Sequence, residues 1–162
     1  MQYACGNDMF DVDLDPSVRL YNEYFSGGMN AIVFQEMREA RGLAYSSYAY
    51  LGQGNTCNEP YYFYAFIATQ NDKMQQAIEA FDEIIENMPQ SEAAFELTKQ
   101  GILTGMATGR TTKMDVIWKY IGDMRFGITD FNRSEAVYNG IQTMTLEDVV
   151  EFQQSHIKGR DY

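Results

Sequence analysis

The sequence predicts a single α+β domain in which neighbouring strands are set among several helices. Two segments rich in aromatic and small residues, 44–51 and 61–69, are typical of strands. The segments before and after them place apolar residues three or four apart, as helices that cover a core on one face do. The 162 residues suit one domain, and no linker, repeat or low-complexity segment divides them.

Two helices are expected before the first strand. An acidic cap followed by proline at positions 15–16 marks the start of one, and the glycine pair 27–28 ends it. Asn30 is expected to cap the next helix. Gly42 is expected to end that helix, because glycine tolerates a left-handed backbone.

The two strands form a hairpin around the loop LGQGNTCNEP. The second strand is apolar on both faces, which predicts a central strand covered by helices on at least one side. Two strands alone make a poor sheet. Either residues 3–5 add a short third strand, or further strands are missing because the chain is a fragment.

Four or five helices are expected after the hairpin. An apolar stripe from Met74 to Met88 predicts the first, and Ser91 caps the second. In the second, three glycines recur every fourth residue and share a face, which favours close approach of another helix or of the sheet, with a flexible helix as the alternative. They are Gly101, Gly105 and Gly109.

A third helix is expected over 114–126 and a weaker one over 132–143. A terminal helix is expected to begin at a capping box. Thr145 and Asp148 have the capping-box spacing. We assign the apolar stripes of all these helices to the core. The stripe of the 114–126 helix consists of Ile117, Ile121 and Met124.

Charge and composition exclude several classes of protein. The chain has 12 Lys and Arg against 23 Asp and Glu, a net charge of −11, which disfavours nucleic-acid binding. No apolar run is long enough to span a membrane, and residues 1–10 lack the pattern of a signal peptide. The compartment stays open between the cytoplasm and the periplasm or cell envelope of a bacterium. Cys5 and Cys57 fit either two separate thiols or one disulfide.

The sequence carries no self-contained active site. It has no zinc helix of the HExxH or HxxEH type, no GxSxG elbow, no Walker loop and no GxGxxG. His156 is the only histidine, and we expect it to be a half-exposed helix residue rather than a metal ligand. One polar pair stands out: Arg38 at a helix end and Tyr45 at a strand start. Spacing alone fits a helix-end charge and an ordinary strand aromatic.

Residues 21–48, YNEYFSGGMNAIVFQEMREARGLAYSSY, resemble the pitrilysin/insulinase family of zinc metallopeptidases. The resemblance is to the non-zinc-binding, inactive domain that follows a zinc-carrying one. It implies an α/β sandwich with helices on a mostly antiparallel sheet, in which two halves of the protein close around an extended peptide. The zinc ligands of the family are absent here, so the resemblance implies no metal and no cofactor in this chain, with zinc in another domain of the parent.

The resemblance also gives the polar pair a role. Arg38 and Tyr45 match an arginine and a tyrosine that reach toward the zinc from the later half of active members. The arginine would contact a substrate carbonyl or carboxylate, and the tyrosine would donate to the oxyanion. Both would act only in the full-length parent, and the chain alone is expected to be inactive.

The leading hypothesis makes residues 1–162 one domain, truncated or not, of a larger multi-domain peptidase. It would be a non-catalytic substrate-binding domain whose partners are a preceding zinc domain of the same polypeptide and a peptide substrate. The alternatives are a catalytically dead structural subunit and an independent acidic peptide-binding module. A fragment with open sheet edges is also expected to pair through them as a homo-oligomer.

Overall fold

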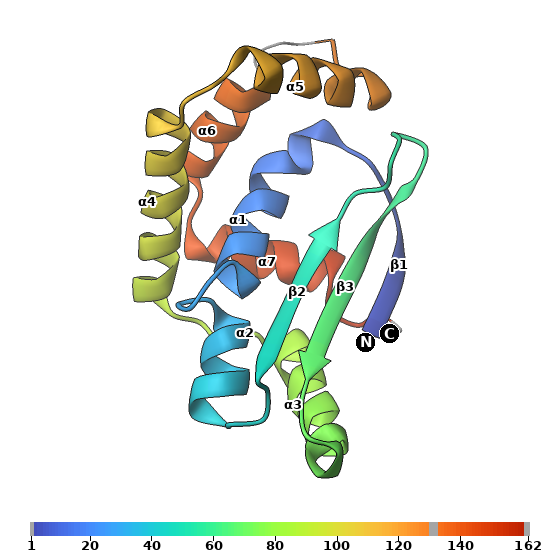
Figure 1. Ribbon diagram of the computed structural model, residues 1–162, viewed down its shortest axis with the longest axis vertical. Helices are drawn as coiled ribbons and strands as arrows, with labels where there is room; N and C mark the ends of the chain where they lie inside the picture. The colour runs from blue at the N-terminus through green and yellow to red at the C-terminus, as the bar shows by residue number, and fades with distance from the viewer. Residues whose placement is uncertain (1, 130–132, 161–162) are drawn as a thin grey trace.

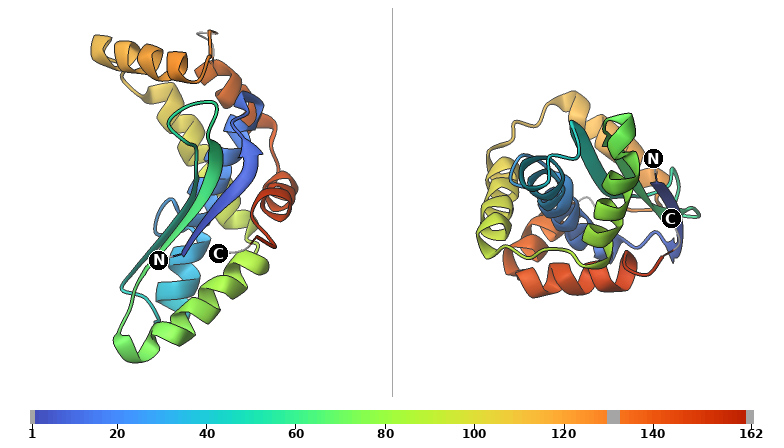
Figure 2. Two further views of the ribbon diagram at one scale, coloured as in Figure 1. Left: turned by 90° about the vertical axis from the view of Figure 1, so that its right-hand side faces the viewer. Right: turned by 90° about the horizontal axis from the view of Figure 1, so that it is seen from below.

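The computed structural model describes residues 2–129 and 133–160, with side chains from residue 8 onward. Its sheet has three antiparallel strands in the order β1–β3–β2: β1 is Gln2–Met9, β2 is Ser46–Gly52 and β3 is Pro60–Ala68. The helices α1, α4, α6 and α7 lie on one side of it (Figures 1 and 2). The α+β class, the hairpin and the central second strand are confirmed, and the third strand is longer than predicted.

The helices follow the predicted order, with short turns between them. They are α1 (Asp15–Ser26), α2 (Ile32–Phe34), α3 (Met74–Glu86), α4 (Glu92–Thr108), α5 (Lys113–Arg125), α6 (Arg133–Thr143) and α7 (Leu146–His156). A 3-10 turn η1 (Val12–Leu14) precedes α1, a π-helical turn η2 (Gln35–Ala40) continues α2, and a 3-10 turn η3 (Asn71–Lys73) precedes α3. Residue 132, the first of the predicted 132–143 helix, lies outside the described residues.

The predicted helix caps have mixed outcomes. Ser91 and the Thr145–Asp148 box cap α4 and α7 as expected. The two caps predicted before β2 are wrong: Leu14 and Ala31 occupy the N-cap positions of α1 and α2, and neither makes a side-chain cap bond. The Asp15 carboxylate instead accepts a bond from Arg133, at 2.5 Å between Oδ2 and Nε, because α6 packs against α1.

Helix α1 occupies the centre of the core, and its four fully buried side chains are Leu20, Tyr21, Tyr24 and Phe25. Aromatic contacts join it to three other elements of the fold. Tyr24 meets Phe95 of α4 with ring centroids 6.2 Å apart, Tyr21 meets Phe152 of α7 at 5.6 Å, and Phe25 meets Phe63 of β3 at 6.3 Å. The sheet and the helical layer are therefore held to the same helix.

Side chains of α1 also bond the outer edge of β2. The Asn22 amide donates to the carbonyl of Leu51 at 2.9 Å and accepts from the Leu51 N–H at 2.7 Å, and the Ser26 hydroxyl accepts from the Ala49 N–H at 2.9 Å. These groups are the ones an edge strand normally leaves open to another chain. Along this stretch of β2 the structure thus offers little to the edge-paired oligomer expected from the sequence.

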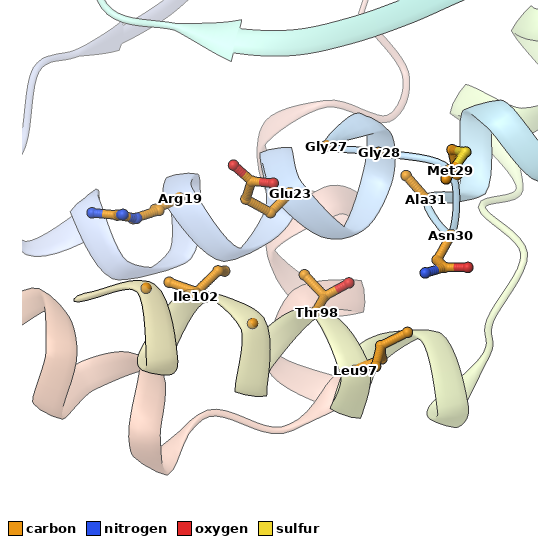
Figure 3. Close-up of a pocket in the computed structure, with 12 residues that line it drawn as sticks. Arg19, Glu23, Gly27, Gly28, Met29, Asn30, Ala31, Leu97, Thr98 and Ile102 are labelled. Atoms are coloured by element: carbon orange, nitrogen blue, oxygen red, sulfur yellow. The ribbon is translucent and has the colours of Figure 1, made fainter. Parts of the chain in front are cut away.

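The glycine face of α4 does not mark a close approach. A Cβ at Gly101 or Gly105 would meet nothing within 4 Å, and both glycines line a hollow of about 360 Å³ between α1 and α4. Figure 3 shows this hollow, with Arg19 and Glu23 of α1 facing Thr98 and Ile102 of α4. The expected packing is therefore wrong at these two positions. The tight contact lies at Gly140 of α6, where a Cβ would come within 2.7 Å of the Pro16 ring.

The apolar stripe of α5 is not part of the core, which corrects the assignment of Ile117, Ile121 and Met124. All three side chains are exposed. The helix lies across one end of the molecule (Figure 1) and makes few close backbone contacts with the other described elements.

Replacing Gly101 or Gly105 with alanine should raise the free energy of unfolding by about 1 kcal/mol each, because alanine favours the helix and its Cβ has free space. Gly140→Ala is the control and should destabilise the protein, since its Cβ would collide with Pro16. Urea unfolding of the three variants measures the difference, and equal effects at the three positions would contradict the packing described.

The capping box of α7 should make the free energy of unfolding depend on pH in the acidic range. Hydrogen bonds from the backbone N–H and then from the hydroxyl of Thr145 lower the pKa of Asp148 below its usual 3.8. A lowered pKa stabilises the fold above pH 3.8, and this contribution is lost as the pH falls through the lowered pKa. Asp148→Asn should flatten the fall of unfolding free energy below pH 4. Urea unfolding at a series of pH values compares the variant with the unchanged protein, and equal slopes would contradict this role of the capping box.

Candidate functional site

The helix-to-strand connection between η2 and β2 is held by an unusual backbone turn. The carbonyl of Met37 accepts hydrogen bonds from the N–H groups of both Leu43, at 2.9 Å, and Ala44, at 3.2 Å. Gly42 makes this reversal with φ at +58°, as its place at the helix end predicted. The reversal follows η2, and π-helical turns such as η2 are rare and are frequent at functional sites.

The start of β2 is anchored to the end of β3 by two short bonds. The N–H of Tyr45 donates to the carbonyl of Ala68 at 2.9 Å, and the Thr69 hydroxyl donates to the carbonyl of Leu43 at 2.5 Å. The backbone on both sides of Tyr45 is therefore held in place, while its side chain is free to face outward.

The structure brings the two predicted site residues together. The guanidinium carbon of Arg38 lies 5.9 Å from the centroid of the Tyr45 ring and 5.2 Å from that of Phe34. These distances allow cation–π attraction, which holds the guanidinium between two rings. Its ion pair is loose, with Nε 3.8 Å from the Glu39 carboxylate. The guanidinium is thus oriented without being neutralised by a close partner.

Both side chains are accessible to a ligand. The Arg38 side chain is 50% exposed and Tyr45 is 83% exposed. Tyr45 lies at the rim of a hollow of about 410 Å³ whose other walls come from residues 42–44 and from the end of β3 with the turn after it. Lys73 also lines this hollow, and its ammonium lies 3.5 Å from the Gly42 carbonyl. The site therefore offers a hydroxyl and two cations beside a concave surface.

A second feature lies next to the site and was missed by the sequence analysis. The face of the sheet opposite α1 carries a run of aromatic rings in contact, with neighbouring centroids between 5.1 and 6.1 Å apart. Alternation along β2 and β3 turns these side chains outward, away from the buried Ala49, Leu51 and Phe63. The outward residues are Tyr48, Tyr50, Tyr62, Tyr64 and Phe66. The signal was the YYFYAF run, apolar on both faces.

The described side chains do not fit a zinc site. No cluster of three or more His, Cys, Asp or Glu side chains occurs among them. The Nδ1 atom of His156 lies 3.1 Å from the Asp8 carboxylate, to which Arg160 also donates. Burial alone would raise the pKa of Asp8, but the bonds from His156 and Arg160 hold it below its usual value. This is a structural ion-pair cluster at the end of α7.

Two further expectations concern the cysteines and the membrane. Cys57 is a free thiol, whereas the side chain of Cys5 lies outside the described side chains. In the described part of the chain, every helix is too short or too polar to cross a membrane.

Comparison with known proteins gives one family and several similar structures. Residues 7–102 match the family model described as Peptidase M16 inactive domain. The peptidase M16 inactive domain from Pseudomonas fluorescens is 22% identical with a TM-score of 0.74, and the match covers 96% of this chain and 37% of that one. No curated protein gives a match.

Two more solved structures share the fold. The inactive peptidase domain of a candidate zinc protease from Bordetella parapertussis is 10% identical with a TM-score of 0.73, and the match covers 98% of this chain and 84% of that one. A protease from Helicobacter pylori is 12% identical with a TM-score of 0.70, with 95% and 37% covered. The chain thus spans well under half the length of the Pseudomonas and Helicobacter proteins.

Proposed function

The chain belongs to the Peptidase M16 inactive-domain family, and from this membership we propose that it is the substrate-binding and closure domain of a zinc-dependent metalloendopeptidase. The resemblance seen in residues 21–48 is thereby confirmed at the level of the family. In the proposal residues 1–162 form one non-catalytic domain, and the zinc is held by another domain of the same polypeptide.

The observation that carries the proposal is the pairing of Arg38 with Tyr45. The guanidinium lies 5.9 Å from the Tyr45 ring, and both side chains are accessible. The pair supplies hydrogen-bond donors and no nucleophile. Such an arrangement can bind and polarise a peptide but cannot cleave it alone.

Each residue of the pair has a defined chemical task in the proposal. The Arg38 guanidinium presents a rigid fork of N–H donors to a carbonyl or carboxylate of the peptide. The Tyr45 hydroxyl donates to the oxygen of the scissile carbonyl as negative charge develops on it. The anchored backbone around Tyr45 limits the reorganisation needed to make that bond.

The open sheet face supports a peptide as the ligand. Strand β2 begins directly after Tyr45 and carries Tyr48 and Tyr50 into the exposed ring cluster. Stacked rings with hydroxyls at their ends give a flat apolar surface with hydrogen-bonding groups. An extended peptide lying along β2 could therefore contact the rings with its side chains while its backbone reaches Tyr45.

In the full-length polypeptide that carries this domain, Tyr45→Phe should lower kcat for peptide hydrolysis about 100- to 1,000-fold, the effect of removing one oxyanion donor. KM should change little, because the ring remains in place. Tyr50→Phe is the control for the chemical step: it removes a hydroxyl of the proposed binding surface, so it can change KM but should leave kcat unchanged. An unchanged kcat in the Tyr45 variant, with cleavage intact, would contradict the oxyanion role.

Arg38→Lys should lower kcat/KM about 10-fold or more, because an ammonium keeps the charge but loses the planar fork. Arg41→Lys is the control, since Arg41 already donates to Glu83 at 2.7 Å and should affect stability rather than turnover. Steady-state kinetics with peptide substrates compare the two. If both variants lose activity equally, the fork at Arg38 has no specific role.

A further inference from the structure

Helix α5 has its apolar side turned to solvent. Seven of its thirteen residues are large apolar side chains, and each is between 37% and 63% exposed. They are Met114, Val116, Ile117, Trp118, Tyr120, Ile121 and Met124. This density of exposed apolar surface on one short helix is unusual for the surface of a monomer.

The polar side of α5 faces the rest of the protein. Asp123 is only 8% exposed and accepts a bond from Arg133 of α6 at 2.8 Å, and Arg133 also reaches Asp15 of α1. The Lys119 ammonium donates to the Ser134 hydroxyl at 2.7 Å. The helix is thus attached through polar contacts, which is the reverse of an ordinary surface helix.

The helix itself is well formed despite this exposure. The Thr112 hydroxyl accepts from the N–H of Asp115, whose carboxylate accepts from the N–H of Thr112 at 2.8 Å. A complete capping box satisfies the first turn of α5. Its outward face is therefore a defined surface and not a frayed end.

The exposed stripe has the spacing of a helix-packing seam. Met114, Ile117, Ile121 and Met124 are separated by three, four and three residues, as alternate a and d positions of a coiled coil are. Both the spacing and the residue types read the same in either direction. A two-fold axis through the middle of the helix would therefore place methionine against methionine and isoleucine against isoleucine.

We propose that α5 is an interface between two copies of this chain, in which the two α5 helices pack antiparallel along this seam. A palindromic seam is self-complementary, and an isologous interface requires that. Each of the seven side chains is between 37% and 63% exposed, so the helix has apolar surface available to bury against a partner. The surface goes beyond the proposed function and does not involve Arg38 or Tyr45.

The contact lies on a part of the chain that carries little net charge. Residues 110–125 hold four basic residues and two acidic ones, a local balance of 4 − 2 = +2 in a chain of −11. Most of the negative charge therefore lies away from the seam. The two copies still repel each other as whole molecules, so salt should strengthen the dimer by screening that repulsion.

Sedimentation of the 162-residue chain tests the proposal. The expected result is a reversible dimer with a micromolar Kd that tightens as sodium chloride is raised. Trp118 is the only tryptophan in the chain and is 63% exposed, so its emission should shift to the blue with increasing protein concentration, over the same range as dimerisation.

Ile117→Glu and Ile121→Glu should each raise Kd at least about 10-fold, because a carboxylate at either position would be buried against an isoleucine of the other copy. Ile78→Glu on α3 is the matched control, since Ile78 is 40% exposed and Ile121 is 37% exposed. Circular dichroism and thermal unfolding establish that each variant is folded, and the two seam positions provide independent variants if one fails to fold.

A chain that stays monomeric at all concentrations would overturn the proposal, as would a dimer that the seam variants leave intact. The same measurements with mixed phosphatidylcholine and phosphatidylglycerol vesicles address another occupant. A blue shift of Trp118 that requires vesicles, in a monomeric chain, would assign the seam to a lipid surface instead and would also overturn the proposal.

Discussion

The rest of the structure depends on the burial of α1 between the sheet and the other helices. Leu20, Tyr21, Tyr24 and Phe25 are fully buried, and each such side chain contributes about 1.5–3 kcal/mol through burial. Their rings meet α4, α7 and β3, while Asn22 and Ser26 on the same helix bond the backbone of β2. One helix therefore sets the distance between the layers and also the position of the outer strand. A change in its packing would be felt on both sides of the core.

This constraint extends to the candidate site through the chain that follows α1. The glycine turn after α1 leads directly into α2 and η2, and β2 returns to bond with α1. Arg38 and Tyr45 thus lie on a segment, from η2 to the start of β2, whose two ends are fixed to the same helix. Within the loop, the Met37 carbonyl and Gly42 set the reversal, and Thr69 closes it onto β3. The pair is exposed, yet its backbone is among the better-anchored parts of the surface.

Local signals in the sequence were enough for the elements and for this loop, because they act over a few residues. Gly42 had to end a helix, Thr145 and Asp148 had to cap one, and the strands followed from their composition. The side of a helix that faces the rest of the protein could not be predicted in the same way. The period of α5 shows a stripe, but its orientation is set by Arg133, which binds Asp123 on one side and Asp15, 118 residues away in the sequence, on the other. The empty space beside Gly101 and the partner of His156 likewise arise from distant segments.

The two apolar surfaces left uncovered differ in what holds them. The tyrosines on the sheet are hydrogen-bonded to one another through their hydroxyls. The bond between Tyr48 and Tyr64 raises the pKa of Tyr64, and the bond between Tyr50 and Tyr62 raises the pKa of Tyr50. Gly52 lets the Tyr62 ring lie against the backbone, where a Cβ would come within 2.5 Å of it. The rings are therefore held by one another and by the strand beneath them. The neighbours of α5 instead bind its polar residues Lys119 and Asp123, while its apolar stripe is exposed. In the two proposals, the ring surface would contact a peptide and the α5 stripe would pack against a second copy of the chain, so the two surfaces would serve different kinds of binding.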